Sequence, residues 1–297
     1  MIITVASGKG GTGKTSVAVN LAAAVSKASE NSQSRSVWLA DCDVEAPNDA
    51  LFMAPRIERK LPVKWMIPEI NLDLCNLCGR CAEVCAYNAI AITSEKPIVF
   101  KDLCHACGSC AAQCPQKAIT EVPEEIGSIE IGKSNGLHFM QGLLTIGFSS
   151  AVPIIREMKR LIAQTHENGS LIIRDSSPGT SCPVVECLRD ADFALLVTEP
   201  TPFGLHDLKL VAEIALDEFH LPAGVVINKS NGDDRIITDY CEAAGLPILM
   251  RVPMSRAIAE VYSRGDLLIE VQPDYQPKFM ELLARIESEA KSVQRPQ

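Results

Sequence analysis

The sequence predicts an α/β fold: a mostly parallel sheet with helices on both faces, into which a small domain is inserted. Two observations predict the sheet. Short apolar runs alternate with segments of helical period, as in βαβ units, and a glycine-rich loop follows the first apolar run. A third observation predicts the insert, because this alternation stops between residues 67 and 122, where cysteine, proline and alanine dominate.

Six apolar runs are expected to form strands, at residues 2–6, 36–40, 170–173, 193–197, 223–227 and 247–251. Helices are expected to begin near Gly13, Pro153, Gly204, Asp233, Arg256 and Gln276. A glycine-rich segment with short apolar runs, 127–147, should return the chain to the sheet as β-structure. We therefore divide the chain into a first part of the main domain (1–66), the insert (67–122) and a second part of the main domain (123–297).

Length and composition limit the classes of protein to consider. The 297 residues are 47% hydrophobic, which is enough for one large domain and one small one. No apolar run approaches the roughly 20 residues that span a bilayer, and the first strand follows Met1 directly. We therefore expect a cytoplasmic protein without a stable membrane anchor. The net charge of −9 disfavours nucleic acid as a partner.

The loop after the first strand, G-K-G-G-T-G-K-T, has the pattern of a phosphate-binding loop. Its glycines let the backbone turn tightly and direct several N–H groups at one anion. Lys14 should neutralise the β- and γ-phosphates, and the hydroxyl of Thr15 should bind Mg²⁺. The pattern predicts the sheet of a P-loop NTPase that binds ATP or ADP with Mg²⁺ through Gly8, Lys9, Gly10, Gly11, Thr12, Gly13, Lys14, Thr15 and Ser16.

A second lysine in this loop, Lys9, points to one family. The segment resembles the deviant Walker A motif of the MinD/ParA ATPases, a group that includes the nitrogenase iron protein and whose members dimerise around nucleotide. The resemblance implies that Lys9 reaches the phosphates bound by a second subunit, in a homodimer or in a heterodimer with a similar ATPase, and stabilises charge there during hydrolysis. The alternative is a solvated surface lysine.

Carboxylates at two strand ends extend this resemblance. The segment 41–43, followed by Asn48, resembles switch I, in which Asp43 would orient or activate the attacking water. The run 171–174, which leads into the segment 175–179, resembles the Walker B strand followed by switch II. Asp175 would then support Mg²⁺ through its water shell, and Gly179 would turn toward the γ-phosphate. Alternatively, Asp175 caps the next helix.

Two later positions resemble the adenine side of the family's site. Asn228 ends the run V-V-I-N, and Pro253 ends R-V-P, which resembles a later loop beside the base. These are the less specific matches, because an asparagine at such a position also closes turns.

The insert contains eight cysteines in two copies of C-x2-C-x2-C-x3-C, in which each cysteine recurs 29 residues later, as Cys75 does at Cys104. This is the spacing of a bacterial two-cluster ferredoxin, where the fourth cysteine of each copy binds the other cluster. We expect a small bacterial-ferredoxin-like domain with two [4Fe–4S] clusters. Cys75, Cys78, Cys81 and Cys114 would hold one, and Cys104, Cys107, Cys110 and Cys85 the other. Zinc is the alternative, although structural zinc sites usually combine two C-x2-C pairs.

The other cysteines carry weaker signals. Cys42, Cys187 and Cys241 are expected in or near the core. Cys182 lies seven residues after Asp175, where the nitrogenase iron protein carries an intersubunit cluster ligand, but we expect a switch-region thiol without metal, since no second such ligand is evident.

These motifs lead to one main functional hypothesis and two alternatives. The main hypothesis is a dimeric, slowly hydrolysing Mg-ATPase whose nucleotide state is coupled to electron transfer, through the two clusters, to a redox partner protein. An iron–sulfur carrier of the Mrp type is one alternative, although no C-x2-C pair follows Cys114. The other is a MinD/ParA-like positioning ATPase. The C-terminal segment 275–292 combines glutamates with an apolar stripe, which suits packing on the core better than a membrane surface.

Overall fold

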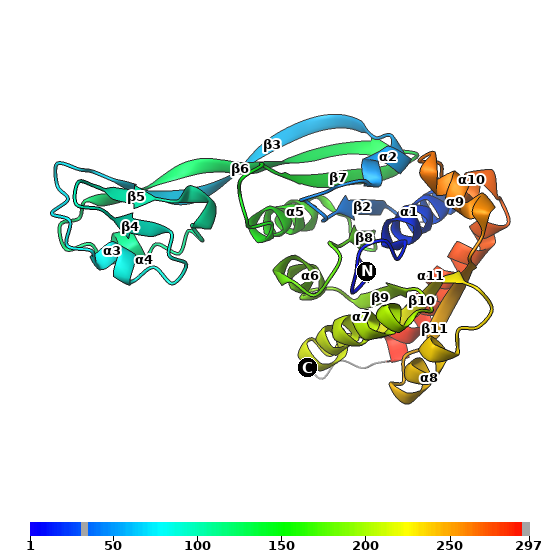
Figure 1. The fold of residues 1–297 in the computed structure, drawn as a ribbon. Coiled ribbons are helices and arrows are strands. Elements are labelled where there is room, and N and C mark those ends of the chain that lie inside the picture. Colours follow the sequence, from blue (N-terminus) through cyan, green and yellow to red (C-terminus); the bar gives the residue numbers. More distant parts are fainter. Residues whose placement is uncertain (31–34, 293–297) are drawn as a thin grey trace.

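The computed structural model describes residues 1–30 and 35–292 (Figure 1). Its strands are β1 (Ile2–Ala6), β2 (Val37–Asp41), β3 (Arg56–Ile70), β4 (Ile90–Ile92), β5 (Pro97–Val99), β6 (Ile119–Ser134), β7 (Leu137–Leu144), β8 (Leu171–Asp175), β9 (Phe193–Thr198), β10 (Ala223–Ser230) and β11 (Ile248–Pro253). All but β4 and β5 form one nine-stranded sheet in the order β11-β10-β9-β1-β8-β2-β7-β6-β3. The strands from β11 to β7 are parallel, and β6 and β3 are antiparallel additions at one edge.

Helices cover both faces of the parallel part. The helices of the described residues are α1 (Lys14–Glu30), α2 (Asp49–Met53), α3 (Arg80–Glu83), α4 (Ser109–Ala112), α5 (Val152–Thr165), α6 (Cys182–Leu188), α7 (Pro202–Glu213), α8 (Arg235–Ala243), α9 (Arg256–Ser263), α10 (Leu268–Val271) and α11 (Tyr275–Ser292), with a 3₁₀ turn η1 (Lys101–Leu103) and a π-helical turn η2 (Ile214–Glu218). Of these, α3, η1 and α4 lie in the inserted segment, away from the parallel strands (Figure 1). The mostly parallel α/β sheet is therefore confirmed. Each of the six expected strands lies on an observed one, and 127–147 forms parts of β6 and β7.

Alternate residues of each central strand divide between two apolar layers. Ile3 and Val5 of β1 belong to the layer beneath α1 and α11, whereas Ala6 belongs to the layer beneath α6 and α7. Buried strands with apolar side chains on both faces are typical of parallel sheets. The apolar stripe of α11, including Phe279 and Ile286, is buried in the first layer, as the sequence predicted. Within the described residues, no helix is both long and apolar enough to cross a membrane.

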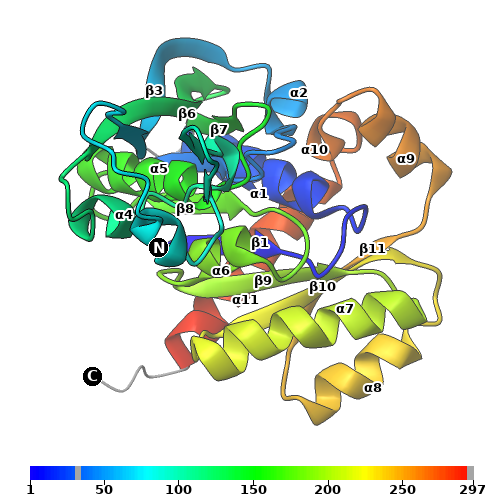
Figure 2. The same ribbon diagram turned by 60° about the vertical axis from the view of Figure 1, so that its left-hand side comes forward.

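The antiparallel strands β3 and β6 extend beyond the sheet as a long two-stranded ribbon (Figure 1). In Figure 2 the far end of this ribbon is turned toward the viewer. Their pairing runs from Arg56 opposite Lys133 to Ile70 opposite Ile119, with a shift of register at two places. At its tip the ribbon carries residues 71–118, which we call the head. The boundaries expected at residues 67 and 122 therefore lie inside these two strands.

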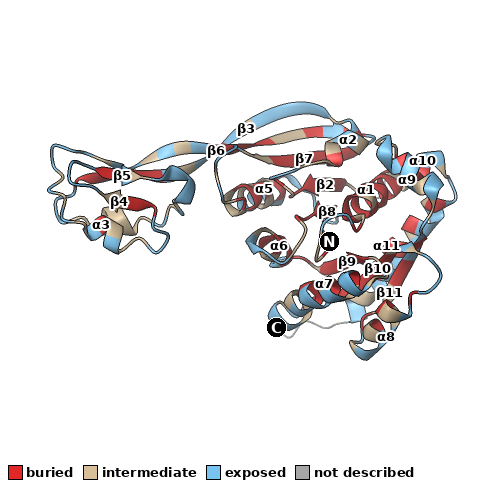
Figure 3. Cartoon of the chain, in the orientation of Figure 1, coloured by how far each residue is buried: buried red, intermediate tan, exposed pale blue. Residues whose placement is uncertain are grey.

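The head has little apolar interior of its own. Its buried apolar cluster consists of Cys81 and Ile90, together with Ile119 at the start of β6, and most of the head is exposed or half-buried (Figure 3). Since small domains with so little core usually need a further source of folding free energy, such as metals or disulfides, the head is the part of the fold where bound metal would contribute most to stability.

The sequence duplication is also a structural duplication. Helices α3 and α4 begin 29 residues apart, at Arg80 and Ser109. Positive φ angles recur at the same shift, 57° at Leu77 and 48° at Ala106, and again 53° at Asn88 and 50° at Lys117. Matching left-handed positions outside glycine are uncommon, so the two halves of the head share one backbone design.

Candidate functional site

The glycine-rich loop connects β1 to α1 at the carboxyl edge of the parallel strands, where α/β sheets bind ligands. Gly11 and Gly13 adopt φ angles of 80° and 90°, which side chains rarely allow. A Cβ on Gly8 would lie 2.1 Å from the carbonyl oxygen of Asp207 in α7. Glycine is therefore required at these positions by the turn itself and by its close approach to α7.

Lys14, Thr15 and Asp175 meet beside this loop. Asp175 ends β8 and is 1% exposed; its Oδ1 accepts a hydrogen bond of 2.6 Å from Lys14 Nζ, and its Oδ2 accepts one of 2.7 Å from Thr15 Oγ1. Burial opposes the charged form of Lys14, but the carboxylate of Asp175 raises the pKa of Lys14 above its ordinary value. The lysine is therefore a permanent cation, positioned for an anionic ligand. Asp175 does not cap the next helix, since Ser181 is the N-cap of α6.

Three buried carboxylates surround the same point. Oxygens of Asp41, Asp49 and Asp175 lie within 4.8 Å of one another. Asp41 accepts hydrogen bonds from three backbone N–H groups of the segment 43–49, whereas neither side-chain oxygen of Asp49 has a hydrogen-bond donor among the described residues. Burial and the charge of Asp175 raise the pKa of Asp41 to about 7, and burial and the charge of Asp41 raise the pKa of Asp49 well above its ordinary value. Oxygen-rich clusters of this kind suit hard cations such as Mg²⁺.

The two predicted switches are tied to each other and to the loop. Cys42 N donates to Asp175 O at 2.8 Å, which joins the start of switch I to the Walker B strand. Gly179 has a φ of 96°, and its N–H donates to Ser7 O just before the glycine-rich loop at 2.8 Å. Asp43 is half-buried near Lys14, and burial raises the pKa of its carboxyl. The expected carboxylates and the glycine are therefore gathered around one site.

Lys9 forms an ion pair within its own subunit. Its ammonium group contacts Glu199, which follows β9. The second carboxylate oxygen of Glu199 accepts a hydrogen bond of 3.2 Å from Lys229, and Lys229 also donates to Gly11 O at 2.7 Å. Burial opposes ionisation of Glu199, but its hydrogen bonds to Lys9 and Lys229 lower its pKa. Lys9 is thus not freely solvated, and Glu199 and Lys229 are two site residues that sequence reasoning missed.

A largely apolar cavity of about 490 Å³ opens beside the same loop. Asn228 and Pro253, the two positions expected near adenine, both line it. Asn228 Nδ2 donates to Thr12 O at 2.7 Å, so this side chain braces the loop and does more than close a turn. The cavity is also bordered by Ser16, Val17, Met254, Ile258, Tyr262 and Phe279. Its position and apolar walls suit a planar base attached to phosphates in the loop.

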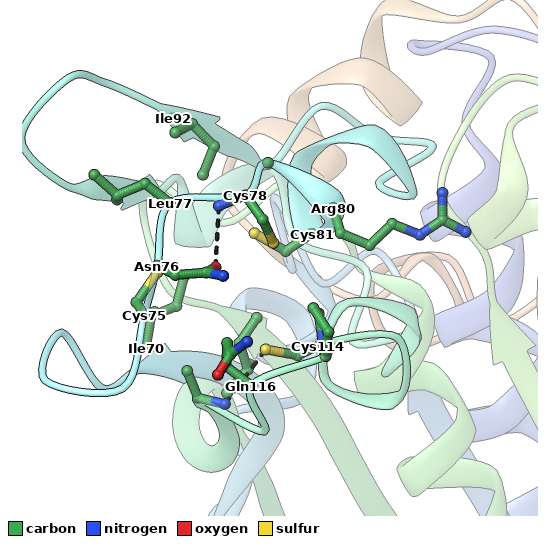
Figure 4. Close-up of a pocket in the computed structure, with 14 residues that line it drawn as sticks. Ile70, Cys75, Asn76, Leu77, Cys78, Arg80, Cys81, Ile92, Cys114 and Gln116 are labelled. Atoms are coloured by element: carbon green, nitrogen blue, oxygen red, sulfur yellow. Dashed lines mark hydrogen bonds between the residues drawn. The ribbon is translucent and has the colours of Figure 1, made fainter.

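The eight cysteines of the head line two separate cavities in the pairing predicted from the spacing. Cys75, Cys78, Cys81 and Cys114 surround the first, which we call the outer cavity, and Figure 4 shows them with Asn76 Oδ1 accepting a hydrogen bond from Cys78 N. Cys85, Cys104, Cys107 and Cys110 surround the second, the inner cavity. The fourth cysteine of each copy has therefore crossed to the other copy's cavity.

The hydrogen bonds to the cysteine sulfurs and the positions of these sulfurs bear on which metal group the two cavities could hold. The N–H groups of Ala89 and Ala118 donate hydrogen bonds to Cys85 Sγ and Cys114 Sγ at 3.2 and 3.3 Å. In the part of the chain that the structure describes, no three cysteine sulfurs lie within 4.8 Å of one another. Four thiolates on one zinc ion would lie about 3.8 Å apart. In this structure the cysteine sulfurs are therefore not gathered around one point as four ligands of a single zinc ion would be.

The remaining cysteines lie as the sequence predicted. Cys42, Cys187 and Cys241 are buried, and Cys182 is exposed at the first turn of α6. Hydrogen bonding to Cys187, together with burial, raises the pKa of the Cys42 thiol well above its ordinary value. The Cys42 thiol is therefore protonated, unlike a metal ligand.

Comparison with known proteins places this site in a family. Residues 3–269 match the CobQ/CobB/MinD/ParA nucleotide-binding domain family. The chain belongs to this family. It is a P-loop ATPase of the MinD/ParA type. Two relatives from Methanocaldococcus jannaschii, both described as uncharacterized, are 37% identical over 230 residues (77% of this chain and 78% of the relative) and 30% identical over 277 residues (91% and 92%).

Similar solved structures share the fold of this MinD/ParA-type ATPase. The cell division ATPase MinD of Pyrococcus furiosus has a TM-score of 0.58 at 20% identity and covers 97% of this chain and 98% of its own. The septum site-determining protein MinD of Pyrococcus horikoshii, complexed with Mg-ADP, has a TM-score of 0.58 at 17% identity, with 97% and 96% covered. A variant of McdA from Cyanothece, in complex with ATP, has a TM-score of 0.57 at 18% identity, with 100% and 98% covered.

Proposed function

We propose that the protein binds Mg-ATP in the glycine-rich loop and hydrolyses it slowly as a nucleotide-dependent dimer, either with itself or with a similar ATPase. The observation that carries this proposal is the convergence of Lys14, Thr15 and Asp175 on one buried point beside an apolar cavity. Lys14 would neutralise phosphate charge, Thr15 would bind Mg²⁺, and Asp175 would hold the water shell of the ion. The cavity would take adenine against Asn228 and Pro253.

Hydrolysis would depend on the second subunit. Asp43 would orient the attacking water, and Lys9 would leave Glu199 to stabilise charge on the phosphates of the partner subunit. A reaction that needs two subunits shows a specific activity that rises with protein concentration until the dimer is saturated. Turnover that is independent of concentration, in a protein that stays monomeric with Mg-ATP, would contradict this part of the proposal.

The head would be a ferredoxin-like domain with one [4Fe–4S] cluster in each cavity. Support comes from the two sets of four cysteines and from the N–H groups donating to sulfur. When bound, such clusters accept and donate single electrons. Anaerobic purification followed by iron, sulfide and zinc analysis tests this, with about eight irons per chain expected for two such clusters. A stoichiometric zinc content without sulfide would overturn it.

The cysteines of the head favour electron transfer to a redox partner. The fold of the whole chain supports a positioning ATPase equally well. Similarity to the cell division ATPase MinD extends over nearly the full length of the chain, which supports a positioning ATPase of the MinD/ParA kind. An iron–sulfur carrier of the Mrp type, also related to the nitrogenase iron protein, is a third candidate. The two cavities are the specific observation in favour of electron transfer.

An anaerobic EPR redox titration with Mg-ATP, with Mg-ADP and without nucleotide separates these roles. A nucleotide-dependent potential or line shape supports ATP-coupled electron transfer, because coupling between two sites is reciprocal. Iron that leaves the protein for an acceptor apoprotein would instead support the carrier. Clusters that stay bound and whose potential and line shape do not change with nucleotide would favour the positioning role. A pull-down of a protein partner in the presence of Mg-ATP would then test that role.

A further inference from the structure

The ATPase core touches one half of the duplicated head. Ser149, in the loop between β7 and α5, donates a hydrogen bond of 2.7 Å from its hydroxyl to Asp102 O. Trp65, on β3, lies with its ring 6.1 Å from the ring of His105 at an interplanar angle of 57°. These two contacts flank Cys104, one of the four cysteines of the inner cavity.

Trp65 belongs to both parts of the molecule. Its side chain packs against the apolar layer of the core that contains Val44 and Ile154. It also contacts His105, whose ring stacks on that of Tyr87 at 3.6 Å between ring centroids. His105 and Tyr87 both line the inner cavity. A shift of the core layer would therefore move the wall of this cavity, since packed side chains transmit displacement.

The core contacts begin at switch I. Val44 follows Asp43, and its carbonyl accepts a hydrogen bond of 2.8 Å from Leu144 N at the end of β7. Thr145, the next residue, donates to Ile126 O of the ribbon strand β6 at 2.9 Å and begins the loop that holds Ser149. Gly142 packs closely under Val44, since a Cβ there would lie 2.5 Å from Val44 Cγ1. Switch I, β7, the loop and Asp102 thus form one continuous set of contacts.

The other half of the head offers an internal comparison. Asp73 and Asn76 occupy the positions that correspond to Asp102 and His105 in the duplication. Their hydrogen bonds stay inside the head: Asn71 Oδ1 accepts from Asp73 N, and Asn76 Oδ1 accepts from Cys78 N. Within residues 1–30 and 35–292, no hydrogen bond, ion pair or ring contact joins either residue to the core. The outer cavity therefore lacks the connection that the inner one has.

We propose that the nucleotide state at switch I is transmitted to the inner cysteine site through Ser149 and Trp65, while the outer site does not respond. This inference rests on the proposed nucleotide and cluster sites. Ser149 and Trp65 are positioning residues. They act on Asp102 and His105, which lie on either side of Cys104 in the sequence. The outer site would then be free to face an external redox partner without changing with nucleotide.

Hydrogen–deuterium exchange of the anaerobically purified protein tests this, with and without a Mg-bound nonhydrolysable ATP analogue. The analogue should change exchange in residues 101–107 by about fivefold or more, which lies within the usual range of allosteric coupling. The corresponding residues 72–78 should change by less than about twofold. The double variant Ser149→Ala/Trp65→Leu should reduce the first response to below about twofold.

Two further variants keep the test specific. Ser149→Ala alone changes an exposed side chain and should weaken the response without unfolding the head. Lys101→Ala removes an ion pair between Glu124 of the ribbon and the first residue of this segment, and should leave the response of residues 102–107 intact. Equal responses in both segments, no response in the wild type, or a full response in the double variant would overturn the inference.

Iron analysis of the same samples separates this inference from the proposed function. A response confined to residues 101–107 in protein that lacks iron would support the transmission and contradict the cluster assignment. Iron-loaded protein that binds the analogue without this response would keep the cluster assignment and overturn the transmission.

Discussion

The ammonium group of Lys9 is paired with the carboxylate of Glu199 in the same subunit. The residue that the family resemblance directs toward a second subunit is therefore bound inside its own. Glu199 also holds Lys229, which in turn contacts the carbonyl of Gly11, so one carboxylate fixes two cations around the loop. For Lys9 to reach the phosphates bound by a second subunit, its ion pair with Glu199 would have to break.

Replacing Glu199 by Gln should make this exchange easier. The neutral amide keeps the shape of the side chain but loses charge attraction to Lys9 and Lys229, and charge-assisted hydrogen bonds are the stronger ones. We expect Mg-ATP-dependent dimerisation at about 3- to 10-fold lower protein concentration, which corresponds to roughly 1 kcal/mol. Analytical ultracentrifugation measures it. Glu213→Gln, at the far end of α7, is the control, and an unchanged or weaker dimer would refute the idea that Glu199 restrains Lys9.

The Lys9→Ala protein should bind ATP and fail to hydrolyse it. Lys14 and the loop backbone remain to hold the phosphates, whereas a cation supplied across the interface contributes about 10³-fold or more to turnover in related phosphoryl transfers. Equilibrium binding of a fluorescent ATP analogue should therefore change by less than about threefold, while single-turnover hydrolysis falls by at least about 100-fold. Normal turnover in this variant would show that Lys9 has no catalytic part.

Asp49 should make the stability of the metal-free protein depend on pH. Its pKa in the folded protein is raised well above the ordinary value, so the neutral form is favoured on folding. The stability that this neutral form contributes is complete below about pH 4 and is lost as the pH rises through the folded-state pKa. Asp49→Asn removes the buried charge and should raise the melting temperature by several degrees at about pH 8, but hardly at about pH 4.5.

Thermal unfolding in EDTA, without nucleotide, measures this difference, because bound Mg²⁺ would compensate the carboxylates. Asp239→Asn, an exposed change on α8, should shift neither end of the pH range. An Asp49→Asn protein that is destabilised at the alkaline end would mean that the Asp49 carboxylate is needed as a hydrogen-bonded or ion-paired group, contrary to its position without a donor.

The sequence predicted the features that depend on local pattern. The glycines of the phosphate-binding motif, Lys14 and Thr15 all lie within residues 8–15. The repeated cysteine spacing predicted which four sulfurs line each cavity. Glu199 could not be predicted as the partner of Lys9, because the two are 190 residues apart and meet only through the order of β1 and β9 in the sheet. Contacts of this kind are set by the tertiary fold.

The ribbon was missed for a different physical reason. The first residues of β3 are exposed on both faces, so they show neither the alternation of a half-buried strand nor the continuous apolar run of a buried one. Their partners on β6 supply the backbone hydrogen bonds that keep them extended. Short helices such as α2 and α10 also lack a detectable period, since each is little more than one turn.

Cys78→Ser should separate the head from the nucleotide site. Cys78 lines the outer cavity and is exposed in the structure, so its loss removes a sulfur ligand without disturbing the apolar layers of the core. Because the buried apolar cluster of the head is so small, loss of a cluster should also cost it order. We expect about half of the iron to be lost and faster limited proteolysis within the head, with ATP affinity changed by less than about twofold.

Cys182→Ser provides the matched control, since Cys182 is also exposed but lies at the start of α6, outside both cavities. That variant should keep its iron and its resistance to protease. Equal loss of iron binding and ATP binding in Cys78→Ser would mean that head and nucleotide site fold as one unit. Loss of iron in Cys182→Ser would instead place a metal ligand in switch II, and the four-cysteine assignment of the outer cavity would be wrong.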